Sequence, residues 1–203
     1  VDPVDIAPHA DAGITAYHAV KKAVDELNPG DTAVAIGIGG LGHIGVQCLN
    51  AMTAADIVAV DLKQSARELA EGYGVDVTLD PSTDDIAAEI EGLTDGVGAK
   101  QVLDFVGADE TTALAPDICA LGGAHHIVGY GGHIHEPAQA LVAGEFSFVG
   151  TLVGQYSELQ ELVALVERGD VDLHTSQHSL GEINEVAEQL EHGEIDGRAV
   201  ITP

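Results

Sequence analysis

Tryptophan is absent from this sequence, and aromatic residues of all kinds make up only 3% of it. The hydrophobic core must therefore be aliphatic, and 45% hydrophobic residues in a chain of 203 are enough to build one. No apolar run approaches the roughly 18 residues that a transmembrane helix needs. The opening residues also lack the basic start and apolar stretch of a signal peptide. We therefore expect a folded cytoplasmic protein without a membrane segment.

Cysteine is nearly as scarce, since Cys48 and Cys119 are the only two in the sequence. Both lie in apolar stretches that have a helical pattern. We expect two reduced core thiols rather than a disulfide or a pair of metal ligands.

Basic residues are the third shortage, with 7 Lys and Arg against 34 Asp and Glu and a formal net charge of -27. Such a surface repels nucleic acids and anionic membranes, so we expect neither as a partner. The hydrophobic content argues against disorder. We favour a folded protein adapted to high salt, because the Debye length falls to about 3 Å at molar ionic strength. An acidic protein of an ordinary cytoplasm is the alternative.

Short apolar runs alternate with amphipathic segments along most of the chain. We expect strands at 32–37, 56–61, 75–80, 99–107, 124–132 and 146–154. We expect helices between them at 44–52, 64–74, 82–94 and 110–121. Strands that alternate with helices through short loops form parallel βαβ units. The sequence therefore predicts an α/β fold with a doubly wound, parallel, six-stranded sheet. Further helices are expected at 10–27, 157–169 and 181–193, an extended segment at 173–180 and a last strand at 197–203.

A glycine-rich loop joins the first expected strand to the helix that follows it. Gly37, Gly39 and Gly42 have the spacing G-x-G-x-x-G. In a dinucleotide-binding turn the first glycine permits the tight bend, the second lets the backbone approach a pyrophosphate, and the third lets helix and strand pack closely. The start of the helix offers free N–H groups to the phosphates. A glycine-rich turn that serves packing alone is the alternative.

An acidic residue stands where such a turn needs one. Asp61 ends the second expected strand, 19 residues after Gly42. An acid there accepts hydrogen bonds from the adenosine ribose and repels a 2′-phosphate, which favours NAD over NADP. Lys63 and Arg67 lie near enough in sequence to weaken that preference, so NADP stays an alternative.

These features together resemble the coenzyme-binding half of zinc-type alcohol dehydrogenases, in the medium-chain dehydrogenase/reductase family. The segments that carry the resemblance follow the family order over nearly the whole chain: "ADAGITAYHAVKK", "IGIGGLGHIGVQ", "VAVDLKQSARELAEGYGVD", "DGVGAKQVLDFVG", "FSFVGTLVG" and "GEINEVAEQLEHGEIDGRAVITP". The resemblance implies a Rossmann domain and hydride transfer between a small-molecule alcohol or polyol and NAD or NADP.

The resemblance also implies a division of the chain. Residues 1–30 would be an interdomain helix segment, 31–154 the NAD-binding Rossmann domain, and 155–203 a segment that returns to the catalytic domain. The N-terminal part of that catalytic domain is expected to be missing from the chain and to be a partner for it.

Further coenzyme contacts follow from the family pattern. Gly40 and Leu41 belong to the phosphate loop, and Arg198 matches a family arginine that approaches the pyrophosphate, with a surface ion pair as its alternative role. Residues at the ends of the fourth, fifth and sixth expected strands should border the coenzyme crevice: Phe105, Val106, Val128, Gly129, Leu152 and Val153.

Zinc is the remaining expectation from the family. Its third protein ligand, usually a cysteine, corresponds here to Asp11, whose alternative role is an ordinary helix N-cap. No four-cysteine run for a structural zinc is present. His133 and His135 form a pair in a glycine-rich loop, but no third ligand converges on them in the sequence, so we predict no metal there. His43, within the phosphate loop, is a candidate to reach the phosphates or the nicotinamide.

Two alternative functions remain open at this point. One is a zinc-free reductase of the same superfamily, and the other is a stand-alone dinucleotide-binding or sensor module without catalysis. We also expect the apolar edge strand 146–154 to pair with the same strand of a second subunit, as the resemblance implies.

The charge imbalance makes a prediction about stability. Thermal unfolding of the chain should shift to markedly higher temperature between about 0.1 M and molar KCl, because salt screens the repulsion among the acids. A neutral osmolyte of equal osmolarity should not reproduce the shift. Melting temperatures that do not respond to KCl would contradict adaptation to salt.

Overall fold

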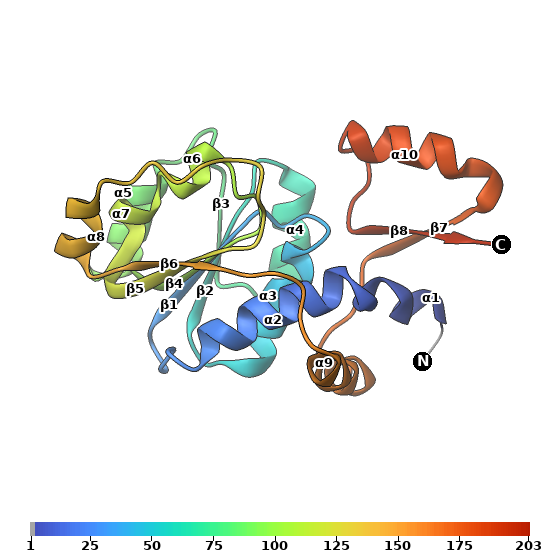
Figure 1. The fold of residues 1–203 in the computed structure, drawn as a ribbon, viewed down its shortest axis with the longest axis horizontal. Helices are drawn as coiled ribbons and strands as arrows, with labels where there is room; N and C mark the ends of the chain where they lie inside the picture. The colour runs from blue at the N-terminus through green and yellow to red at the C-terminus, as the bar shows by residue number, and fades with distance from the viewer. Residues whose placement is uncertain (1–2) are drawn as a thin grey trace.

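Six parallel strands form the main sheet of the computed structural model, which describes residues 3–203 (Figure 1). Their order in the sheet is β3-β2-β1-β4-β5-β6. The strands are β1 (Thr32–Ile36), β2 (Asp56–Val60), β3 (Val77–Leu79), β4 (Ala99–Asp104), β5 (Cys119–Ile127) and β6 (Ser147–Gly150). The order reverses between β1 and β4, which is the doubly wound arrangement of the Rossmann fold. The predicted fold class is confirmed.

Helices connect the strands and flank the sheet. They are α1 (Pro3–Ile6), α2 (Ala12–Val24), α3 (Gly42–Met52), α4 (Gln64–Gly72), α5 (Ile86–Leu93), α6 (Asp109–Thr112), α7 (Ala115–Ile118), α8 (Ala138–Gly144), α9 (Tyr156–Arg168) and α10 (Ile183–Glu191). Two short 3-10 helices are η1 (Ala7–Ala10) and η2 (Leu180–Glu182). Of the expected segment 1–30, residues 1–2 lie outside the part that the structure describes.

The central strand β1 is buried on both faces, which explains its continuous apolar sequence. Ala33 and Ala35 belong to a core cluster shared with α2, α3 and α9. Val34 and Ile36, on the opposite face, belong to a second cluster shared with α5. A parallel sheet covered by helices on both faces requires apolar residues at every position of such a strand. The carboxyl end of β1 is thereby held rigidly where the glycine loop begins.

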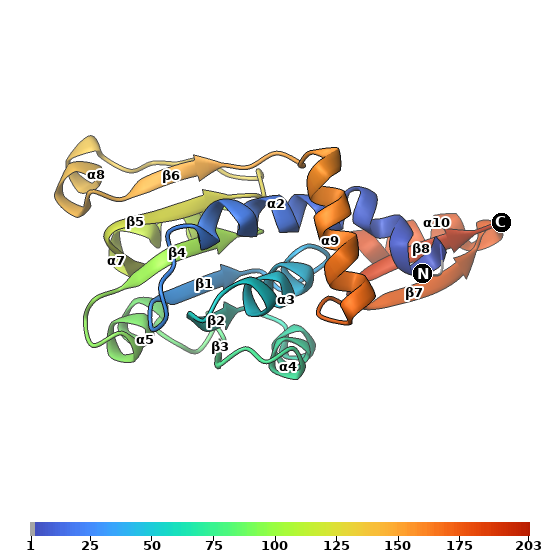
Figure 2. The same cartoon turned by 90° about the horizontal axis from the view of Figure 1, so that it is seen from below.

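A smaller sheet lies beside the main one. β7 (Thr175–Ser179) pairs in parallel with β8 (Arg198–Thr202), and α10 connects them. Figures 1 and 2 place this pair at the same end of the molecule as α1, and Figure 2 shows α9 between it and the main sheet. This arrangement brings Arg198 near the glycine loop.

The expected helix 110–121 and the expected strand 146–154 differ from the structure, and one helix was not expected. The expected helix 110–121 is two single-turn helices, α6 and α7, and β5 starts at Cys119 inside the expected helical range. The expected strand 146–154 is a strand only over Ser147–Gly150. Thr151 still donates its N–H to the carbonyl of Ile127 over 2.9 Å, but the next residues are not in a strand, and Val153 adopts a left-handed φ of 47°. The helix α8 was not expected.

Both cysteines are free thiols, as predicted. Burial raises the pKa of each to about 12, so both are protonated at neutral pH. Among residues 3–203 no helix has the length and hydropathy to span a membrane.

Candidate functional site

The turn after β1 is built on close backbone contacts. Gly37 has a φ of +84°, a conformation that favours glycine, and its N–H donates to the carbonyl of Val60 over 2.8 Å. A Cβ on Gly42 would lie 1.8 Å from the carbonyl oxygen of Gly37. A Cβ on Gly39 would meet no atom within 4 Å. Two glycines therefore allow the tight turn, and the third opens the backbone to a ligand.

The start of α3 is suited to an anion. Leu41 is the N-cap residue, and no side chain caps the helix there. In residues 3–203, the N–H groups of Gly40 and Leu41 donate no hydrogen bond. Unpaired amides at a helix N-terminus bind phosphate oxygens. Gly40 and Leu41 thus lie where the sequence predicts the phosphates.

His43 does not face this opening. It is fully buried, and its Nδ1 lies 2.8 Å from the carbonyl oxygen of Gly39. Burial lowers its pKa, so the ring is neutral. A buried ring does not fit the role considered for His43 at the phosphates or the nicotinamide. The ring instead packs beneath the glycine loop and contacts its backbone at Gly39.

Asp61 is held in place by two backbone N–H groups. Its Oδ2 accepts from Ile38 over 2.6 Å, and its Oδ1 accepts from Lys63 over 2.8 Å. These bonds fix the carboxylate beside the glycine turn, which is the position that a ribose-binding acid requires.

Two cavities meet at Asp61. The larger has a volume of about 690 Å³ and lies beyond the carboxyl ends of β1, β2 and β4. The smaller, of about 120 Å³, lies between Gly39, Lys63 and Asp196. Ligands of doubly wound sheets bind in this crevice at the carboxyl ends of the strands. Asp61 lines both cavities, so they adjoin at this residue.

Both cations next to Asp61 are already engaged. Arg67 donates to the carbonyls of Asp61 and Leu62 over 2.6 and 2.9 Å and forms an ion pair with Asp80 at 2.9 Å. The ammonium group of Lys63 donates to the carbonyl of Gly193. Arg67 therefore holds the loop after β2 and is not free to bind a 2′-phosphate without losing these partners.

Arg198 reaches the phosphate loop from the smaller sheet. A Cβ on Gly40 would lie 3.0 Å from a guanidinium nitrogen of Arg198. The backbone N–H of Arg198 donates to His174, which fixes the residue at the start of β8. The structure thus brings together the loop and the arginine predicted to share its phosphates.

The predicted residues at the end of β4 border the crevice in different ways. Val106 is 45% exposed and lines the larger cavity. Phe105 is half-buried and packs on α3, where a Cβ on Gly45 would lie 2.4 Å from its ring. Asp104 supports this turn by accepting from the N–H groups of Val106 and Gly107. Burial acts to raise the Asp104 pKa, but hydrogen bonds led by that from His125 outweigh it, so the pKa lies below its usual value.

The remaining strand-end predictions lie elsewhere. Val128 is 6% exposed and packs in the core. Gly129 packs on the carbonyl of Val106. Leu152 is 82% exposed and, with Val153, lies beyond the end of β6. Neither of these last two lines the cavities beside Asp61.

Several cavity residues were not singled out from the sequence. Pro81 and Asp84 lie in the loop after β3, and Glu110 and Thr111 lie in the short helix α6 that follows β4. The available signal was their position just after strands of a parallel sheet, where ligand-binding loops gather.

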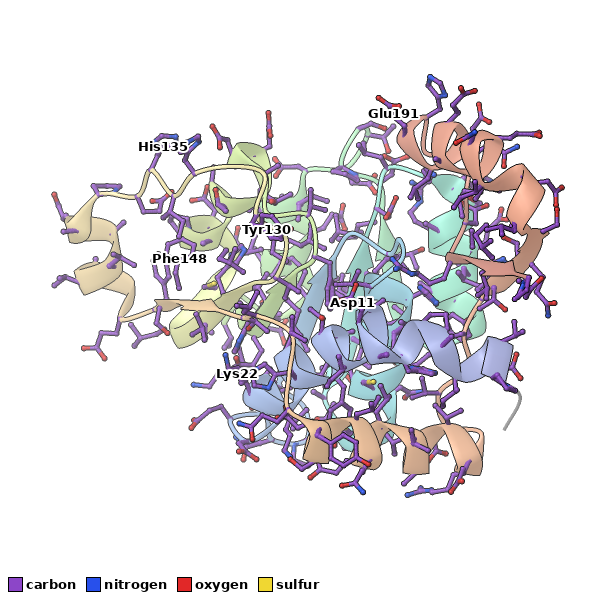
Figure 3. The ribbon with its side chains drawn as sticks, turned by 45° about the vertical axis from the view of Figure 1, so that its right-hand side comes forward. Asp11, Lys22, Tyr130, His135, Phe148 and Glu191 are labelled. Atoms are coloured by element: carbon purple, nitrogen blue, oxygen red, sulfur yellow. The ribbon has the colours of Figure 1, made fainter. Side chains whose placement is uncertain are left out.

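Asp11 lies at the junction of η1 and α2 (Figure 3). It is exposed, and its side chain makes no capping hydrogen bond. Asp11 is thus the N-cap residue of α2 by position, but its side chain does not cap the helix, and the carboxylate is available to a ligand. Among residues 3–203, however, Asp11 belongs to no group of three metal-ligating side chains.

Comparison with known proteins agrees with this geometry. A family model described as zinc-binding dehydrogenase matches residues 40–168. The crystal structure of the alcohol dehydrogenase of Aeropyrum pernix matches with a TM-score of 0.94 and 46% identity, covering 98% of this chain and 58% of that one.

Two curated relatives match over nearly the whole chain. An NAD-dependent alcohol dehydrogenase of Sulfurisphaera tokodaii is 35% identical, covering 98% of this chain and 58% of that protein. A D-arabinose 1-dehydrogenase (NADP(+)) of Saccharolobus solfataricus is 33% identical, covering 100% of this chain and 59% of that protein. The chain thus spans less than two thirds of the length of these relatives.

The position of Asp61 makes a prediction about coenzyme choice. The chain should bind NADH more tightly than NADPH. Asp61→Asn should weaken NADH binding about tenfold or more, because hydrogen bonds to a charged group contribute about 1.5–3 kcal/mol. The same substitution should reduce the ratio of NADH affinity to NADPH affinity. Fluorescence titration in molar KCl measures both affinities.

Asp76→Asn is the matched control. Asp76 is an exposed aspartate whose carboxylate, like that of half-buried Asp61, accepts a backbone N–H, here that of Ile57 over 2.8 Å. Its substitution should leave both affinities unchanged. Equal affinities in the wild type, or a ratio that Asp61→Asn does not alter, would contradict the role given to Asp61.

Proposed function

Because this chain belongs to the zinc-binding dehydrogenase family, we propose that it is the NAD(P)-binding part of an alcohol or polyol dehydrogenase. The observation that carries the proposal is the convergence of the glycine turn, the open start of α3 and Asp61 on one crevice. Relatives named alcohol dehydrogenases support the reaction class, which is hydride transfer between an alcohol and a nicotinamide.

The coenzyme would lie along the two cavities. Its pyrophosphate would contact the amides of Gly40 and Leu41, with Arg198 on the other side. Its adenosine ribose would donate to Asp61, and the adenine would enter the cavity of about 690 Å³. We propose NAD as the coenzyme because Arg67 is already bound to Asp80. NADP is the second candidate, because one relative is a D-arabinose 1-dehydrogenase named for NADP(+).

We propose that the catalytic site of the longer protein holds a zinc ion. Asp11 would supply one ligand, since its carboxylate is exposed and uncapped. Zinc in such a site polarises the alcohol oxygen when it is bound. A catalytic zinc needs three protein ligands, so the others would come from a catalytic domain outside residues 3–203. That domain would also supply most of the alcohol pocket.

Assembly and environment complete the proposal. β6 is an edge strand of the main sheet, and we propose that segment 146–154 pairs with its counterpart in a second subunit. The net charge of -27 supports a salt-rich cytoplasm as the working environment.

The proposal predicts binding without catalysis for the 203-residue chain. Calorimetry in molar KCl should show one NADH site per chain, while alcohol-dependent NADH formation should be absent with or without added zinc. A single metal ligand cannot retain catalytic zinc against water. Sedimentation of the same samples should show a dimer or larger species.

A second experiment distinguishes the zinc-dependent dehydrogenase from the alternative functions. In a polypeptide extended by the family's catalytic domain, alcohol oxidation should appear. Asp11→Asn should remove the catalytic zinc and the activity, while NADH binding stays. Robust turnover by the 203-residue chain alone would contradict the proposal that the catalytic site needs residues of a further domain. Failure to bind NADH would overturn the whole proposal, and activity of an extended protein without metal would favour the zinc-free reductase.

A further inference from the structure

Three side chains suited to a metal ion meet on the surface between α6 and the loop after β5. Asp109 is the first residue of α6, and His133 and His135 lie in the loop that leads to α8. One ligand atom from each lies within 4.8 Å of the other two. All three side chains are exposed, so an ion could reach them from solvent.

The backbone of the two loops holds these residues together. The N–H of Gly132 donates to the carbonyl of Gly107 over 2.7 Å, and the hydroxyl of buried Thr112 donates to the carbonyl of His133 over 2.8 Å. A Cβ on Gly132 would lie 2.4 Å from the backbone nitrogen of Asp109, so only glycine permits this approach. The cluster is therefore fixed by backbone bonds and does not depend on its side chains alone.

The separations fit a small coordination sphere. Nδ1 of His133 lies 3.4 Å from Oδ1 of Asp109, and Nε2 of His135 lies 3.6 Å from Oδ2. Ligands at about 2.0–2.1 Å from a tetrahedral zinc are roughly 3.3 Å apart. An ion placed among these atoms would need only small side-chain movements.

We propose that Asp109, His133 and His135 form a binding site for a divalent transition-metal ion of the zinc type, completed by water. Two imidazoles distinguish it from the many acidic groups of this surface, because Mg²⁺ and Ca²⁺ prefer oxygen ligands and zinc accepts nitrogen. The N–H of His133 donates to Oδ1 of Asp109 over 2.6 Å, which holds the carboxylate beside the two rings.

The site is separate from both sites already described. Figure 3 shows His135 far from Asp11, on the opposite side of the labelled Tyr130. None of its three residues lines the cavities at Asp61. A bound ion would fasten the loop after β5 to α6, and thereby to the turn after β4 that borders the coenzyme crevice. Its effect would be on the stability of that loop, since a ligand that binds only the folded state stabilises it.

The test is zinc binding by the full chain in molar KCl with excess Mg²⁺ to occupy sites made only of oxygen. The wild type should bind one zinc equivalent that His133→Ala, His135→Ala and Asp109→Asn each weaken by about tenfold or more, since even outer-shell partners of a metal contribute that much. Asp109→Asn retains an oxygen to accept the N–H of His133, so the loops keep their arrangement. Co²⁺ in place of zinc gives the same comparison by visible absorption.

Matched controls separate this site from the general surface. His192→Ala removes another exposed histidine, Glu145→Gln another exposed acid, and Asp11→Asn the ligand assigned to the other site. All three control variants should still bind one zinc equivalent with the affinity of the wild type. The proposal is overturned if the variants at 109, 133 and 135 bind zinc as the wild type does, or if Mg²⁺ displaces the ion.

Discussion

The contact between Gly42 and the carbonyl of Gly37 is the constraint on which the site depends. It brings the first turn of α3 against the end of β1, where no side chain fits between them. With the helix this close, His43 is buried beneath the loop, and Phe105 packs on Gly45. Within residues 3–203 the N–H groups of Gly40 and Leu41 stay unpaired, the Arg198 guanidinium lies beside Gly40, and the N–H of Ile38 holds the Asp61 carboxylate. A phosphate cradle made of backbone thus follows from the absence of side chains at a few positions.

Cations are scarce in this protein, and their distribution is informative. Of 7 Lys and Arg residues, Lys63, Arg67 and Arg198 gather around the crevice. Two of them bind backbone carbonyls or an acid and shape the loop after β2, while Arg198 lies beside Gly40. Acids also line the larger cavity, so the unevenly placed cations favour an anionic group mainly at the end of the crevice beside Gly40 and Arg198.

Local features were predictable from the sequence, and contacts between residues far apart in the sequence were not. The glycine spacing, the buried strands and Asp61 depend on residues close in sequence, and the structure places them as expected. The expected helix 110–121 was wrong because its apolar residues have the period of one helix, whereas the chain makes two single turns, with Pro116 at the start of the second, and then β5. Asp109 escaped notice as a partner of His133 because 24 residues separate them, and only the packing of two loops brings them together.

The most direct measurement of this account compares two glycine-to-alanine variants for stability and NADH affinity. Gly42→Ala should lower the free energy of unfolding by about 1–3 kcal/mol, as overpacking does, and should abolish saturable NADH binding. Gly92→Ala, at an exposed position of helix α5 with no atom within 4 Å of its added Cβ, should be neutral or slightly stabilising and bind NADH normally. A Gly42→Ala protein that folds and binds NADH as the wild type does would contradict the central role of this contact.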